Sequence, residues 1–170
     1  CLRGWGTSTK HPLRRLTMTS SPYILISDAS RPIVTLSLTL KVGQLRDPEG
    51  QEGLAYLTGQ MLMRGTEIRS YSQLNEDLDY LGSSFGIAVG RDRIGFSGDA
   101  LTRHLEDYES LLGEILTCPT FPSAELEKLR RQLLAEFEAV RDHDPTLGKR
   151  QFVKQFYGTH PYGRPLKGTP

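Results

Sequence analysis

Few residues of this chain have the chemistry to bind a metal ion or act as a nucleophile. Four histidines are scattered along the sequence: His11, His104, His143 and His160. No two of them have the spacing of a metal-binding pair, so each is interpreted as a surface or turn residue. The two cysteines, Cys1 and Cys118, form neither a CxxC pair nor a disulfide framework. Histidine and cysteine alone therefore predict no metal site.

The stretch GLAYLTGQMLMRGT, residues 53–66, is the most informative part of the chain. Its apolar side chains recur with helical spacing and predict one buried stripe: Leu54, Leu57, Met61 and Leu62. Between them, Tyr56 and Gln60 supply a phenol and an amide. The stretch therefore predicts a short helix that packs inward and carries no acid or base.

The composition limits the classes of function. The 170 residues are enough for one domain with a real core, and 37% hydrophobic and 24% charged residues are typical of globular proteins. The 21 Lys and Arg are interspersed with 20 Asp and Glu, which disfavours a nucleic-acid partner. No apolar run approaches the roughly 20 residues of a membrane helix, so no transmembrane segment is expected.

The first part of the chain predicts a leader followed by strands. Residues 1–15 lack any periodicity and are expected to form an irregular leader, with one domain over residues 16–170. Ile24 and Ile26 alternate with other residues and predict a half-buried strand. A second strand is predicted from its alternating apolar side chains: Val34, Leu36, Leu38 and Leu40.

The middle of the chain predicts a helix and a hairpin. Ser70 with Gln73 has the spacing of a capping box, and Gly82 is placed to end that helix. Apolar residues then alternate on both sides of a turn at residues 90–92, which predicts a β-hairpin.

Helical patterns fill the rest of the sequence. One ends at Cys118, and a long one starts at Ser123, with a predicted buried stripe of five side chains: Leu126, Leu129, Leu133, Phe137 and Val140. A polar interruption at residues 142–145 precedes a last helix over residues 146–157. This order of elements predicts an α+β sandwich, a mostly antiparallel sheet covered by helices.

Four segments, in this order and spacing, resemble the N-terminal domain of peptidase family M16, which includes pitrilysin, insulinase and mitochondrial processing peptidase. They are KVGQLRDPEGQEGLAYLTGQMLMRGT, LDYLGSSFG, CPTFPSAELEKLRRQLLAEFEAVRDHDPTLGKRQF and HPYGRPLKGT. The resemblance implies a LuxS/MPP-like metallohydrolase-type domain. The family's second, related domain has no counterpart here, so a truncated first domain of a longer subunit is expected.

Active members of the family carry the zinc motif HxxEH on the helix that resembles residues 56–60. Residues at i, i+3 and i+4 share one helix face, so two histidines bind zinc while the glutamate acts as general base. In this chain Tyr56 replaces the first histidine, Gly59 the base and Gln60 the second histidine. The resemblance therefore implies a degenerate motif and no catalytic residue.

A third zinc ligand of the family, a more distant glutamate, corresponds by resemblance to Glu136 in LLAEFEAV. One carboxylate cannot hold a catalytic zinc, and a tyrosine and a glutamine are poor substitutes for histidine. Glu136 is therefore a vestigial ligand position or an ordinary solvated helix glutamate. No cofactor is expected, although zinc is expected in active relatives. Tyr56 and Gln60 keep an alternative role in peptide binding.

The resemblance implies three candidate functions. The preferred one is a non-catalytic subunit that partners an HxxEH-bearing zinc peptidase, as a hetero- or homodimer, and helps to enclose or bind a peptide substrate. The alternative is a scaffolding homologue with no role in proteolysis. An active enzyme with an unusual metal is disfavoured because Gly59 supplies no base.

The sequence leaves the compartment open, with a bacterial cytoplasm or periplasm as the candidates. Cys1 is compatible with the acylated N-terminus of a mature lipoprotein, but also with an arbitrary boundary of the sequence.

Overall fold

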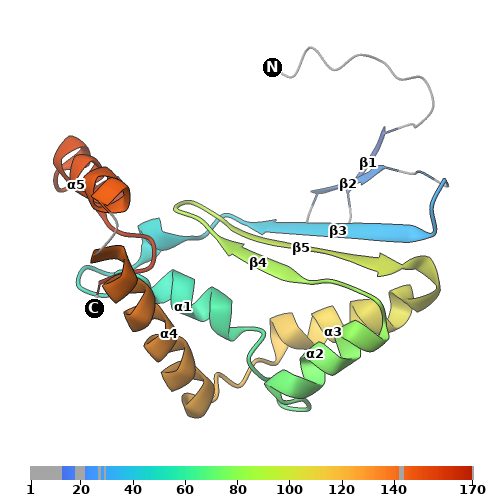
Figure 1. The fold of residues 1–170 in the computed structure, drawn as a ribbon. Coiled ribbons are helices and arrows are strands. Elements are labelled where there is room, and N and C mark those ends of the chain that lie inside the picture. The colour runs from blue at the N-terminus through green and yellow to red at the C-terminus, as the bar shows by residue number, and fades with distance from the viewer. Residues whose placement is uncertain (1–12, 18–21, 27, 29, 142–143, 170) are drawn as a thin grey trace. The chain divides into compact units, whose positions relative to one another are not determined.

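The computed structural model describes residues 13–17, 22–26, 28, 30–141 and 144–169. The chain divides into two compact units, residues 1–32 and residues 33–170. Figure 1 shows the course of the chain and labels its helices and strands. The predicted α+β class is confirmed, with an antiparallel sheet and helices in the larger unit.

The first unit contains an antiparallel pair of strands, β1 (Leu13–Thr17) and β2 (Pro22–Ile26). Strand β1 starts inside the expected irregular leader, and the rest of that leader, residues 1–12, lies outside the described residues. Ile24 and Ile26 are 68% and 64% exposed, so the prediction of a half-buried strand is wrong for them. A two-stranded sheet offers an apolar face little to pack against.

The second unit is built on a three-stranded antiparallel sheet of β3 (Ile33–Leu40), β4 (Gly86–Val89) and β5 (Ile94–Leu101), in the order β3-β5-β4. Val89 pairs with Ile94 across the predicted turn, where the Gly90 N–H donates to the Arg93 carbonyl at 2.8 Å. The predicted hairpin is therefore confirmed. The side chains of Val89 and Ile94 are buried on the face that the helices cover.

Three helices, α1 (Leu54–Met61), α2 (Tyr71–Tyr80) and α3 (Leu105–Thr117), lie on one face of this sheet (Figure 1). The Ser70 side chain and the Gln73 side chain form the predicted capping box at the start of α2. Gly82 follows the end of α2 with φ +59°, a left-handed conformation that glycine adopts without strain. Leucines of α2 and α3 then form the largest core cluster with Tyr108.

Helix α4 (Ser123–Arg141) packs on α1, where Met61 is buried against three α4 side chains: Leu129, Leu133 and Phe137. Two predicted members of the apolar stripes, Leu54 and Leu126, are instead 46% and 37% exposed. Both lie in the first turn of their helices. The prediction that these two leucines are buried is therefore wrong.

The remaining elements are α5 (Asp144–Tyr157) and three short 3₁₀ helices, η1 (Gln44–Arg46), η2 (Thr102–His104) and η3 (Pro161–Gly163). Helix α5 begins within the polar interruption that the sequence predicts before it, and residues 142–143 of that interruption, with His143, lie outside the described residues. Among the described helices, none combines the length and the apolar character that crossing a membrane requires.

Candidate functional site

The helix that carries the degenerate motif is held at its start by a side chain from outside it. Gly53 precedes α1 with φ +98° and has no side chain to cap the helix. The carboxylate of Asp47 does this instead, since it accepts hydrogen bonds from the N–H groups of Gly53 and Ala55, each at 2.9 Å. Asp47 is buried, and these bonds satisfy it.

Gly59, which the resemblance places at the position of the family's general base, faces strand β4. A Cβ atom built on Gly59 would lie 2.5 Å from a methyl carbon of Val89, closer than real Cβ contacts allow. Close packing of α1 on the sheet therefore depends on the missing side chain. A glutamate at this position would have to displace a buried valine before it could act as a base.

The other two motif positions remain on α1. Tyr56 is half-buried and packs both on the Met61–α4 cluster and on the cluster of Val89, Ile94 and Phe96. Gln60, one turn further along the helix, is also half-buried. The three motif positions thus have a packed phenol ring at Tyr56, no side chain at Gly59 and an amide at Gln60.

Glu136 and Tyr56 are brought together by a residue that sequence reasoning missed. The Lys167 ammonium lies 2.5 Å from a carboxylate oxygen of Glu136 and 5.4 Å from the centroid of the Tyr56 ring. The hydrogen bond to Glu136, with a smaller contribution from Tyr56, raises the pKa of Lys167 above its ordinary value. The Lys167 side chain is therefore protonated and positively charged beside Glu136 and Tyr56.

Lys167 belongs to residues 164–168, which we call the strap. The Arg164 carbonyl accepts hydrogen bonds from Gln44 at 3.1 Å and from Arg91 at 3.2 Å. Just before the strap, Tyr162 stacks edge-on against Tyr157 and lies under the Arg91 guanidinium. These contacts hold the strap against η1 and the turn between β4 and β5.

The side chains at the motif do not fit a zinc ion. Among the residues that the structure describes, no three His, Cys, Asp or Glu side chains lie close enough together to hold a metal. The carboxylate of Glu136 already pairs with an ammonium group, and phenol and amide oxygens are poor zinc ligands. Two described histidines bond elsewhere: His104 accepts from Arg103, and His160 accepts from the Tyr162 N–H.

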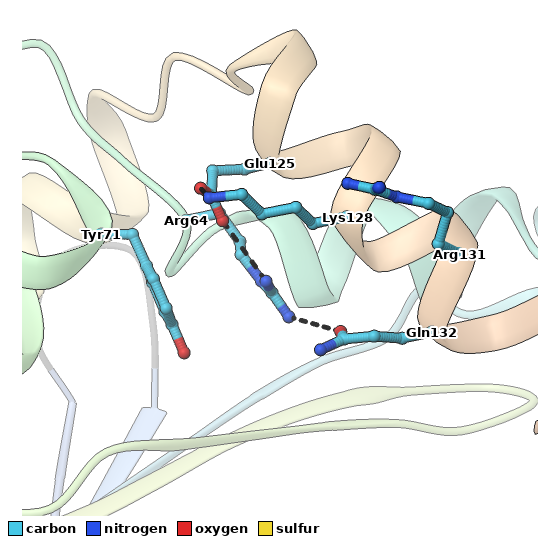
Figure 2. A pocket seen from close by; sticks show the side chains of 6 residues that line it. All are labelled: Arg64, Tyr71, Glu125, Lys128, Arg131 and Gln132. Carbon is cyan, nitrogen blue, oxygen red and sulfur yellow. Dashed lines mark hydrogen bonds and ion pairs between the residues drawn. The ribbon is translucent and has the colours of Figure 1, made fainter. Parts of the chain in front are cut away.

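A second feature joins the connection between α1 and α2 to the opposite end of α4, in the open hollow that Figure 2 shows. The Arg64 guanidinium lies 5.0 Å from the centroid of the Tyr71 ring and bonds to Glu125 at 3.4 Å and to Gln132 at 3.3 Å. We call these four residues the clamp. Lys128 also contacts Glu125, and its hydrogen bond is the first cause of a lowered Glu125 pKa, with Arg64 adding to it.

Comparison with known proteins decides the family. The sequence model of insulinase, peptidase family M16, matches residues 23–170. The chain belongs to peptidase family M16.

Individual relatives agree with this assignment. An uncharacterised zinc protease of Rickettsia bellii (strain RML369-C) is 25% identical over 136 residues, which cover 80% of this chain and 33% of that protein. Human mitochondrial cytochrome b-c1 complex subunit 1 is 24% identical over 110 residues, 65% of this chain and 23% of that protein. This M16 chain thus spans about a third or less of these relatives.

A solved structure gives the fold comparison. The crystal structure of a peptidase M16 inactive domain from Pseudomonas fluorescens superposes with a TM-score of 0.87 and 26% sequence identity, over 92% of this chain and 38% of that one. The M16 peptidase-like fold implied by the sequence is therefore confirmed.

Proposed function

We propose that this M16 peptidase-like chain is the non-catalytic member of a peptidase pair. In this role it partners a zinc peptidase subunit that carries an intact HxxEH motif, and it helps to enclose or bind the peptide substrate. The single observation that carries the proposal is the contact between Gly59 and Val89. The position of the general base has no side chain, and the neighbouring valine takes the space that one would need.

Two further observations support this proposal. Glu136, the position of the distant zinc ligand, is held by Lys167. The Pseudomonas fluorescens domain, whose fold this chain shares with a TM-score of 0.87, is itself described as inactive. Both observations favour a chain that has the M16 fold without the chemistry of an intact HxxEH motif.

A zinc and activity measurement tests the loss of catalysis. The purified chain is expected to hold no stoichiometric zinc and to leave a library of quenched fluorescent peptides uncut. Addition of a co-purifying M16 subunit with HxxEH is expected to produce hydrolysis above that of the subunit alone. Tight zinc that is lost on Glu136→Ala but kept on Glu138→Ala, an exposed glutamate on the same helix, would contradict the proposal.

The contribution to peptide binding rests on Tyr56 and Gln60. The Tyr56 ring is engaged by core side chains and by Lys167, so the Gln60 amide is the better candidate to bond an extended peptide backbone. Gln60→Ala is expected to weaken peptide binding by the reconstituted pair several-fold. Thr58→Ala, an exposed change on the same helix, serves as the control and should leave binding unchanged.

Scaffolding in a larger complex is the second candidate function. It is favoured by the similarity to cytochrome b-c1 complex subunit 1. Affinity purification of the chain from its own cells separates the two functions. An HxxEH-bearing partner supports the peptidase pair, whereas a stable complex without any M16 peptidase supports scaffolding.

A further inference from the structure

The strap lies directly on residues 52–53, immediately before α1, because two glycines allow close backbone contact. A Cβ atom on Gly168, which has φ +80°, would lie 2.2 Å from the Glu52 carbonyl oxygen. A Cβ atom on Gly53 would lie 2.8 Å from the Lys167 carbonyl oxygen. Any side chain at either position would push the strap away, so the glycines fix where Lys167 emerges.

The strap is also held by polar contacts on both sides of Lys167. The Gly168 N–H donates to the Pro165 carbonyl at 3.1 Å, which closes a tight turn around the lysine. The Arg164 guanidinium lies 3.8 Å from the Glu52 carboxylate, next to the start of α1. A backbone held in this way presents the Lys167 side chain to one place, the space between α1 and α4.

In that space the lysine meets two of the side chains at the positions that resemblance assigns to the family's metal site, Glu136 and Tyr56. Its ammonium bonds to Glu136 on α4 and faces the ring of Tyr56 on α1. An ammonium group shares with a divalent cation its attraction to a carboxylate and to the face of an aromatic ring. Unlike a metal ion, the ammonium group is covalently attached to the chain and cannot dissociate from it.

We infer that the Lys167 ammonium is a built-in cation that occupies the degenerate motif in place of a metal ion. Two features exclude divalent metals from the face of α1 that carries Tyr56 and Gln60. One is the replacement of the histidine ligands, and the other is the positive charge of Lys167. Return of histidines to α1 is therefore insufficient to restore a metal site. This inference concerns the motif face itself and goes beyond the proposed role in a peptidase pair.

Zinc affinity in engineered full chains tests the inference. Tyr56→His with Gln60→His supplies two histidines beside Glu136, a ligand set without any change at Gly59. Lys167→Met added to this variant is expected to increase zinc affinity on the order of tenfold or more, because a positive charge at ligand distance is removed. Isothermal titration with zinc measures both variants, after circular dichroism has confirmed that each one folds.

The matched control is Lys128→Met in the same two-histidine variant. Lys128 also pairs with an α4 glutamate, Glu125, but at the other end of the helix. Its loss should leave zinc affinity unchanged, and Glu136→Gln should abolish the gain that Lys167→Met gives. Equal zinc affinity with and without Lys167 would overturn the inference. These affinities involve no partner subunit or peptide, so they are independent of the proposed function.

A cross-linking measurement on the unaltered chain needs no engineered site. A water-soluble carbodiimide activates a carboxylate and couples it to an adjacent amine, with loss of one water to form an amide. Mass spectrometry is expected to find Lys167 joined to Glu136 and, as a positive control, Lys128 joined to Glu125. The control link without a Lys167–Glu136 link would overturn the inference, even where the histidine variants fail to fold.

Discussion

Helix α4 carries two glutamates that each bind a cation from another part of the fold, and the two sites differ in burial. Glu125 and Glu136 are eleven residues apart, about three helical turns, so they lie on nearly the same face. In the clamp, the side chains of Glu125 and Arg64 are 14% and 15% exposed. At the motif, those of Glu136 and Lys167 are 53% and 39% exposed.

This difference indicates that the two contacts contribute differently to the molecule. When one partner of a largely buried ion pair is removed, the folded protein loses stability, because the other charge is left without a partner. A half-exposed pair contributes little to stability, because water and salt screen it. The clamp therefore stabilises the contact of α4 with the connection between α1 and α2, whereas the Lys167–Glu136 pair mainly determines what can occupy the motif.

The largest expected effect is at the packed side of the motif. Gly59→Glu should destabilise the fold by about 3 kcal/mol, because it forces a side chain against a buried valine and places a carboxylate in an apolar contact. Urea denaturation measures the loss. The double variant Gly59→Glu/Val89→Ala should be less destabilised than the sum of the two single variants. Simple additivity would show that this side of the motif has free space.

The clamp should give the next largest effect. Arg64→Met keeps most of the stem of the side chain but removes its bonds to Glu125 and Gln132. We expect a loss of stability larger than that of Lys167→Met, because the Glu125 carboxylate loses one of its cations and keeps only Lys128. Arg131→Met, in the same hollow but exposed, is the control and should change the free energy of unfolding little. Equal losses for the two variants would remove the distinction between the sites.

Acid should weaken the clamp in a defined pH range. The bonds from Lys128 and Arg64 lower the pKa of Glu125 in the folded chain below its ordinary value of 4.5. The ionised carboxylate therefore stabilises the fold fully above about pH 4.5, and this contribution is lost as the pH falls through the lower, folded-state pKa. The difference in unfolding free energy between wild type and Glu125→Gln should shrink as the pH falls below 4.5. A constant difference from neutral pH to pH 3 would contradict this.

The smallest expected effect is at the Lys167–Glu136 pair. Lys167→Met should cost less than about 1 kcal/mol of stability at low salt, and less still at high salt. Thermal unfolding at two salt concentrations measures it. A loss as large as that of Arg64→Met would mean that the strap is a main support of the fold, and the contrast between the two ends of α4 would fail.

Local sequence signals predicted much of the fold, because the interactions involved are close in sequence. The capping box of Ser70 and Gln73 spans three residues, and the hairpin turn is set by Gly90 and its neighbours. Burial at helix ends was predicted less well, as Leu54 and Leu126 show. Helical periodicity identifies the apolar face but not how far along the helix its partner extends.

The side chains around the motif could not be predicted in the same way. Resemblance indicated Tyr56, Gly59 and Gln60, and also Glu136, but it gave no reason to expect a lysine from the strap. Lys167 and Glu136 are 31 residues apart, and Arg64 and Glu125 are 61 apart. Such contacts depend on how helices and loops pack in three dimensions. An acidic residue such as Asp47 before a helix without its own cap is one signal that sequence reasoning can use in other chains.

The Asp47 carboxylate also determines how α1 responds to charge. The exposed N–H groups at the start of a helix attract anions, and a free helix start near a substrate groove can bind the terminal carboxylate of a peptide. In α1 a carboxylate of the protein itself already binds the N–H groups of Gly53 and Ala55. These two N–H groups are therefore already satisfied and offer little attraction to the carboxylate of an approaching acidic peptide.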